Sequence, residues 1–80
     1  MNTTTSNFDK DKAAIKMVIL TKTGDTNAVW YNFLKHNSWS HGNIINGMKR
    51  RFLNSRMANS AQVLQFYNNQ TDMLIEEHHQ

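Results

Sequence analysis

The sequence contains no cysteine and no proline, and it has only three glycines in 80 residues. Without cysteine there is neither a disulfide framework nor a thiolate metal site, which fits a reducing compartment. Apolar runs such as Met17–Leu20 are far shorter than the roughly 20 residues of a membrane-spanning helix. The N-terminal segment 1–6 is polar and holds no apolar signal core. We therefore predict a cytoplasmic protein that does not enter a membrane.

Acidic residues are missing from a long central stretch, because none occurs between Thr26 and Thr71. The six acids lie nearer the two ends, and the formal net charge is +3. Four cations fall close together within the acid-free stretch: Lys49, Arg50, Arg51 and Arg56. A basic segment without carboxylates favours binding to a polyanion. Nucleic acid is thus the first partner to consider, and an acidic host protein is the alternative.

The length predicts a single small domain over residues 9–80, as a monomer or homodimer. A polar, disordered tail over residues 1–8 precedes it. The elements described below make the predicted fold class α+β. Residues 9–23 have two interpretations. Ala13, Met17 and Leu20 follow helical spacing toward a stop at Gly24, whereas Ile15, Met17 and Ile19 alternate as in a strand over 14–22. Both interpretations stay open on the sequence alone.

Two helices and a hairpin follow. The spacing of Val29, Trp30, Phe33 and Leu34 predicts a helix over 26–36, capped by Asp25 or Thr26. A second helix is predicted over 40–57, with Ser40 as its N-cap and with these residues buried: Ile44, Ile45, Met48 and Phe52. Its Gly47 indicates either close approach of another element or simple tolerance of a weak helix former.

Residues 62–78 alternate as in a β-hairpin whose turn covers 68–71. An even-length loop would place Leu64, Phe66, Met73 and Ile75 on one face, and a slip by one residue would divide them between two faces. If residues 14–22 are a strand, the element order becomes β-α-α-β-β.

The run from Ser40 to Phe52 reads SHGNIINGMKRRF. It has a serine cap, aliphatic residues four apart at Ile44 and Met48, and a basic pair directly after them. In this it resembles the recognition helix of winged helix-turn-helix domains, and the chain also resembles small phage accessory proteins in style. The resemblance implies a winged-helix-like fold, with two short-linked helices and a C-terminal hairpin as the wing. It also implies binding to DNA or RNA, for which a regulatory role is one option.

On this interpretation the second helix packs on the first and turns its polar residues outward. Asparagine can pair with adenine, and cations contact phosphates. Trp39, between the two helices, either packs on the core or stacks on an unpaired base. The predicted nucleic-acid-binding residues are Lys35, Trp39, His41, Asn43, Asn46, Lys49, Arg50 and Arg56.

Other interpretations remain. At 100° per residue the four cations do not form one stripe, so they can equally form a solvated face. The small size and exposed aromatic residues also suit a phage-type inhibitor or modulator of a host protein. A small RNase-like enzyme would use His36 and His41 as acid and base. We predict no catalytic residue, no cofactor and no metal, because adjacent ligands in the His78-His79 tail point to opposite sides of a strand.

Overall fold

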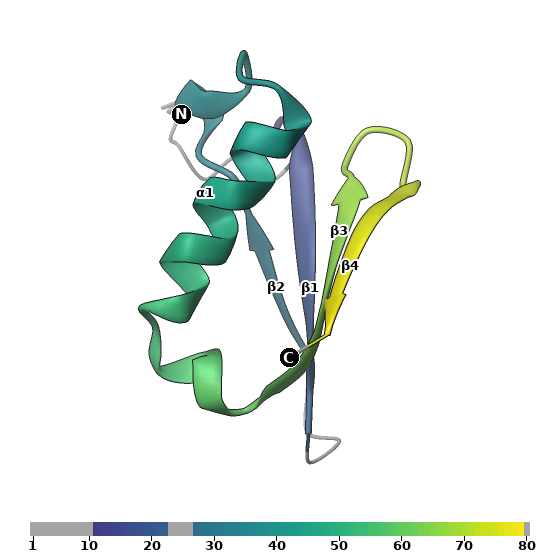
Figure 1. The fold of residues 1–80 in the computed structure, drawn as a ribbon. Coiled ribbons are helices and arrows are strands. Elements are labelled where there is room, and N and C mark those ends of the chain that lie inside the picture. The colour runs from purple at the N-terminus through teal and green to yellow at the C-terminus, as the bar shows by residue number, and fades with distance from the viewer. Residues whose placement is uncertain (1–10, 23–26, 80) are drawn as a thin grey trace, which may run out of the picture.

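The structure is a computed structural model that describes residues 11–22 and 27–79. Its elements are β1 (Ile15–Thr21), β2 (Ala28–Tyr31), η1 (Leu34–His36), α1 (His41–Leu53), η2 (Arg56–Asn59), β3 (Ala61–Asn68) and β4 (Leu74–His79). The strands form an antiparallel sheet in the order β2-β1-β3-β4, and α1 lies against one face (Figure 1). The predicted α+β class is confirmed, whereas the winged-helix layout with two short-linked helices is wrong.

The segment that fitted both a helix and a strand contains the strand β1. Ile15, Met17 and Ile19 are fully buried, while Lys16 and Val18 are half-buried on the opposite face. β1 lies in the middle of the sheet and pairs with β2 on one side and β3 on the other. Ladders on both sides satisfy the backbone, and the β-branched residues suit a pleated surface. The predicted tail over 1–8 and the stop at Gly24 lie outside the described residues.

The helix predicted over 26–36 is wrong. Ala28–Tyr31 form the edge strand β2, and Leu34–His36 form a single 3-10 turn. The apolar residues that suggested a helix are divided between this short strand, which holds Val29 and Trp30, and the loop and turn after it, which hold Phe33 and Leu34. Trp30 points toward α1 and packs edge-to-face on Phe52, with 5.8 Å between the ring centroids. The capping positions Asp25 and Thr26 lie outside the described residues.

The second predicted helix is confirmed, and it ends at Leu53 rather than near residue 57. Ser40 caps it, since its Oγ accepts the backbone N–H of Asn43 at 3.2 Å. All four residues of the predicted apolar face are buried: Ile44, Ile45, Met48 and Phe52. They pack on the helix-facing side chains of β1 and β3, which include Met17 and Phe66, rather than on a preceding helix. Arg56–Asn59 form the separate 3-10 turn η2.

The C-terminal hairpin is confirmed, but the predicted common face is wrong. Leu64 and Phe66 are buried and stand opposite His78 and Glu76, and the register shifts between Phe66 and Tyr67. Met73, Leu74 and Ile75 are 68%, 51% and 41% exposed. Figure 1 shows the reason, because β4 is the outer strand on the side of the sheet away from α1. The apolar side chains of β4 therefore have no layer to pack against among the described residues.

Candidate functional site

A buried amide holds the loop after β2 against the beginning of β1. Asn32 is 2% exposed, and its side-chain oxygen accepts the backbone N–H of Ile15 at 2.8 Å. Its Nδ2 donates to the carbonyl of Phe33 at 2.8 Å and to Oδ1 of Asn37 at 2.7 Å. A buried amide is stable only when its donors and acceptor are paired, and here they are. The loop path is therefore determined by side chains rather than by a ladder.

Asn37 extends the same network. Its Oδ1 also accepts the N–H of Ala14 at 3.1 Å, and its Nδ2 donates to the carbonyl of Lys12 at 2.8 Å. Two residues later, the ring of Trp39 stacks on the ring of His36, with centroids 3.8 Å apart and planes inclined by 16°. The network and the stack together place a 46% exposed indole beside the N-terminal half of α1.

Trp39 and one side of α1 form a groove of about 380 Å³. Its lining residues are Trp39, Asn43, Asn46, Gly47 and Arg50, and we call it the Trp39 groove. The helical residues recur at intervals of three or four, so they share one side of α1. A Cβ atom built on Gly47 would meet nothing within 4 Å. Of the two interpretations of Gly47, close approach of another element is therefore not met, and tolerance of a weak helix former is left. The missing side chain keeps the groove open.

A second hollow of about 210 Å³ adjoins this groove and shares Trp39, Gly47 and Arg50 with it. It extends under the η1 loop to Phe33 and Arg51. Those two residues also line a third hollow, so the second hollow shares lining residues with both of the others.

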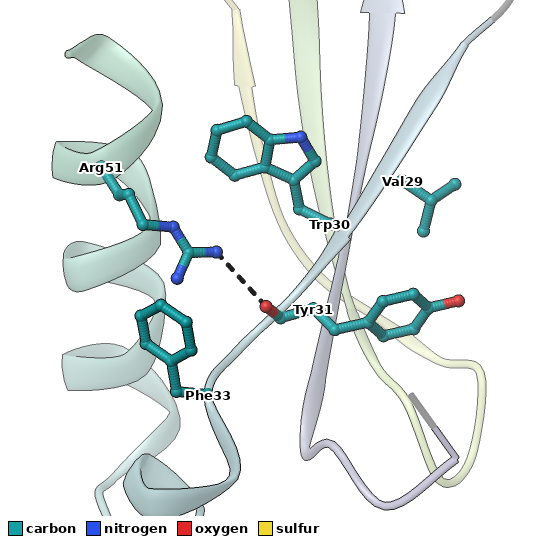
Figure 2. A pocket seen from close by; sticks show the side chains of 5 residues that line it. All are labelled: Val29, Trp30, Tyr31, Phe33 and Arg51. Atoms are coloured by element: carbon teal, nitrogen blue, oxygen red, sulfur yellow. Dashed lines mark hydrogen bonds between the residues drawn. The ribbon is translucent and has the colours of Figure 1, made fainter. Parts of the chain in front are cut away.

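The third hollow, of about 360 Å³, lies between α1 and the edge strand β2 and is lined by Val29, Trp30, Tyr31, Phe33 and Arg51 (Figure 2). We call it the edge hollow. The Arg51 guanidinium lies 4.4 Å from the ring centroid of Phe33 and 5.2 Å from that of Trp30. Its Nη2 donates to the carbonyl oxygen of Tyr31 at 3.3 Å. Burial lowers the pKa of Arg51 from its ordinary value, although an arginine retains its charge.

The structure gathers half of the predicted nucleic-acid-binding residues and separates the rest. Trp39, Asn43, Asn46 and Arg50 meet in the Trp39 groove. The other four lie apart from it: Lys35, His41, Lys49 and Arg56 line none of the three hollows.

Each of these four has other surroundings. Lys49 forms an ion pair with Glu76 and lies 5.8 Å from the ring centroid of Phe66. Lys35 lies 5.8 Å from the ring centroid of Phe33. His41 is the exposed first residue of α1, and Arg56 begins η2 beyond its end. The cations of the second helix thus do not form a continuous basic stripe, as their angular spacing indicates.

Sequence reasoning missed Arg51, Phe33 and Trp30 as parts of a common depression. The available signal was the position of Arg51 at the border of the apolar face of its helix. A cation at such a position must either reach water or pack on aromatic rings. The partner rings come from β2 and the loop after it, which sequence spacing assigned to a helix.

The described carboxylates lie away from these three hollows. Asp72 pairs with Lys16 at 3.3 Å, and Glu76 pairs with Lys49. Glu77 accepts a hydrogen bond from Gln65 at 2.9 Å and contacts His79 at 2.9 Å. The hydrogen bond from Gln65, followed by the interaction with His79, lowers the pKa of Glu77. No described carboxylate lines the hollows, so none neutralises Arg50 or Arg51 there.

The surroundings of the histidines bear on the alternative that His36 and His41 act as an acid and base. His36 is stacked on Trp39, and within residues 11–22 and 27–79 no hydrogen bond joins it to His41. The same residues contain no group of three or more histidine, cysteine or acidic side chains that could hold a metal. No helix in the described part of the chain has the length and apolar content needed to cross a membrane.

Comparisons with known proteins identified no relative: no family model matches the chain, and neither curated proteins nor solved structures gave a match.

Proposed function

We propose that the protein binds single-stranded nucleic acid in the Trp39 groove, without catalysing a reaction on it. The observation that carries this proposal is the convergence of an exposed indole, two amides and a guanidinium on one carboxylate-free groove. Proteins that bind single strands combine an aromatic stacking surface with cations that follow the phosphates. The groove offers both, because the Trp39 indole lies just before α1 and the Arg50 guanidinium lies on α1.

Each group has a distinct part in this proposal. The indole of Trp39 stacks on an unpaired base, which contributes about 1–3 kcal/mol per base. Arg50, one to two turns along the helix from the asparagines, pairs with a phosphate. The amides of Asn43 and Asn46 reach the base edge, where an asparagine side chain can form two hydrogen bonds with adenine. Gly47 leaves the backbone open to close approach of the ligand.

A single strand suits this groove better than a duplex. A helix in a duplex major groove needs cations on both flanks to contact the two phosphate backbones. On α1, Lys49 is paired with Glu76 and Arg51 donates to Tyr31, which leaves Arg50 for phosphate contact. Stacking on Trp39 also requires a base that is not already stacked within a helix. A regulatory, cytoplasmic role fits this proposal but is not needed for it.

Binding is tested with fluorescein-labelled twelve-nucleotide single strands of RNA and DNA, and with the corresponding duplex, at two salt concentrations. We expect salt-dependent binding that is tighter for single strands. Affinity that is undetectable at low salt, or that does not change with salt, contradicts the proposal, because phosphate contacts release counterions.

Two arginine variants of equal charge locate the site. Arg50→Ala should weaken binding of every sequence and reduce the salt slope by about 0.7 for a single strand. Arg56→Ala removes the same charge from η2, outside the groove, and should have a much smaller effect. Equal losses from the two variants would indicate diffuse attraction to a basic protein rather than a site.

Two further variants separate stacking from sequence preference. Trp39→Ala should lower affinity about tenfold or more for all sequences, because it removes the stacking surface. Asn43→Ala should mainly reduce the preference for adenine-containing strands. If adenine preference is absent in the native protein and unchanged in the variant, the amides do not read bases.

A further inference from the structure

The free edge of β2 exposes backbone groups that the sheet does not use. Asn32 N–H donates to the carbonyl of Ile15 at 3.3 Å, and the register pairs Val18 with Val29 and Lys16 with Tyr31. Hydrogen-bonded and non-hydrogen-bonded pairs alternate along an antiparallel ladder. Val29 and Tyr31 are therefore non-hydrogen-bonded residues with respect to β1. Their N–H and C=O groups point away from the sheet.

The bond from Arg51 agrees with this assignment, because it reaches the outward carbonyl of Tyr31. No other bond to the outward groups of Val29 or Tyr31 occurs among the described residues. Val29 is also 44% exposed. β2 thus presents a short edge on which another extended chain can continue the ladder.

The edge hollow lies directly beside these groups. Figure 2 shows Trp30 and Phe33 on the side of β2 toward α1, with the Arg51 guanidinium between the helix and the strand. In an added strand, alternate side chains point to the same face as Trp30. One of them would enter the edge hollow, and its rings favour a large apolar side chain there.

Arg51 indicates the charge of the partner. Its guanidinium has five N–H donors, and among the described residues one hydrogen bond engages them, from Nη2 to the carbonyl of Tyr31 at 3.3 Å. It forms no ion pair with a described carboxylate. A guanidinium held between two aromatic rings is well placed to take a carboxylate with two parallel hydrogen bonds. An acidic side chain two positions from the apolar one, and so on the same face of the added strand, would complete this arrangement.

We propose that the β2 edge binds an extended peptide segment of a partner protein, which adds a strand to the sheet. The segment places a large apolar side chain in the edge hollow and a carboxylate on Arg51. The opposite edge of the sheet is less suited, because β4 carries Glu76 and Glu77 and none of the three hollows lies beside it. This interaction is independent of the Trp39 groove.

The probe is a fluorescein-labelled hexapeptide, Thr-Phe-Val-Glu-Val-Thr, titrated against the full chain; its phenylalanine and glutamate are two positions apart and share one face of the added strand. Matched peptides carry alanine for phenylalanine, lysine for glutamate, or an N-methyl group on the amides that face β2. We expect measurable binding of the first peptide and at least tenfold weaker binding of each of the others. Equal binding of all four peptides overturns the proposal.

Variants of the protein test the edge itself. Val29→Pro removes an outward N–H without breaking the β1 ladder, since proline is tolerated on an edge strand. Val29→Thr is the matched control that keeps the N–H. We expect tenfold weaker peptide binding for Val29→Pro and for Arg51→Gln, and little change for Val29→Thr. Circular dichroism and the thermal midpoint establish that each variant is folded, and an Arg51→Lys variant that folds should bind more weakly than the native chain.

Amide hydrogen exchange and NMR shifts give a second readout that does not depend on variants. Peptide binding should slow exchange at Val29 and Tyr31 and shift the indole N–H signal of Trp30. Shifts confined to β4, or to the Trp39 groove, overturn the proposal. So does displacement of the peptide by an unlabelled oligonucleotide, which would assign the edge hollow to the nucleic-acid path.

Discussion

Replacing Asn32 with alanine tests how the loop that carries Trp39 is held. The substitution removes the acceptor of the Ile15 N–H and the donors to Phe33 and Asn37. Ile15 is fully buried, and a buried N–H without an acceptor costs about 1–3 kcal/mol. The two remaining contacts are worth roughly 0.5–1.5 kcal/mol each where water cannot replace them.

We therefore expect Asn32→Ala to lower the free energy of unfolding by about 2–6 kcal/mol. That is a large part of the roughly 4–12 kcal/mol typical for a domain of this length. Urea denaturation, followed by tryptophan fluorescence and by circular dichroism, measures the change. If the m-value, the slope of the unfolding free energy against urea concentration, is the same for both proteins, the substitution does not alter the denatured state.

Asn54→Ala is the matched control for this experiment. Asn54 is exposed, and its side chain donates one hydrogen bond, to the carbonyl of Arg50 at 3.2 Å. Its loss should cost about 0.5 kcal/mol or less, as for other surface substitutions. If Asn32→Ala were no more destabilising than Asn54→Ala, the network would not be what fastens the loop to β1.

The remaining predictions concern the helix and the outer strand. Gly47→Ala and Gly42→Ala should each raise the free energy of unfolding, measured by urea denaturation, by up to about 1 kcal/mol, because either Cβ would enter open space. Gly47→Leu should reduce oligonucleotide binding, because its side chain would fill the Trp39 groove, whereas Gly42→Leu should leave binding unchanged. Ser40→Ala should cost about 1 kcal/mol through loss of the N-cap, which lowers the thermal midpoint by about 4–8 °C. The lowered pKa of Glu77 means that the fold favours its charged form, so this contribution is present above the ordinary pKa and is lost as the pH falls. Gln65→Ala should therefore make the thermal midpoint less sensitive to acid, and an unchanged acid dependence would refute the role of that bond.

Local chemistry was sufficient for α1 and for the hairpin. A serine cap, apolar residues at helical spacing and a following polar segment define a helix by contacts within a few residues, and the structure has it at His41–Leu53. Alternation and an asparagine-rich turn likewise define β3 and β4. In the turn, Asn68 Oδ1 accepts the N–H groups of Gln70 and Thr71 at 2.9 and 3.1 Å. Among the described residues other than glycine, however, the one with positive φ is Asp72 at 62°.

Local chemistry was not sufficient for the chain before α1. The same apolar residues fit a helix and a strand in residues 9–23, and β3, which follows far along the sequence, supplies the second ladder that makes β1 a strand. In β2, Trp30 finds Phe52 on α1, and Asn32 finds the backbone of Ile15. These partners are absent from a local window, so spacing alone predicted a helix there.

The candidate site divides in the same way. Asn43, Asn46 and Arg50 lie on one side of a helix, which follows from their spacing in the sequence. Trp39 reaches the same groove because the hydrogen bonds of Asn32 and Asn37 and the stack with His36 hold its loop in place. Lys49 does not line the groove, and it forms an ion pair with Glu76 of β4.

The amino-acid sequence by itself determined the capped central helix, the C-terminal hairpin and the carboxylate-free character of the middle of the chain, because each depends on neighbours along the sequence. The tertiary structure alone decided that the two segments before the helix are strands, that Lys16 and Lys49 pair with carboxylates from the C-terminal hairpin, and that an arginine lies between two aromatic rings at an open sheet edge. Those outcomes depend on side chains and backbone groups brought together from distant positions, where burial and pairing outweigh local preference.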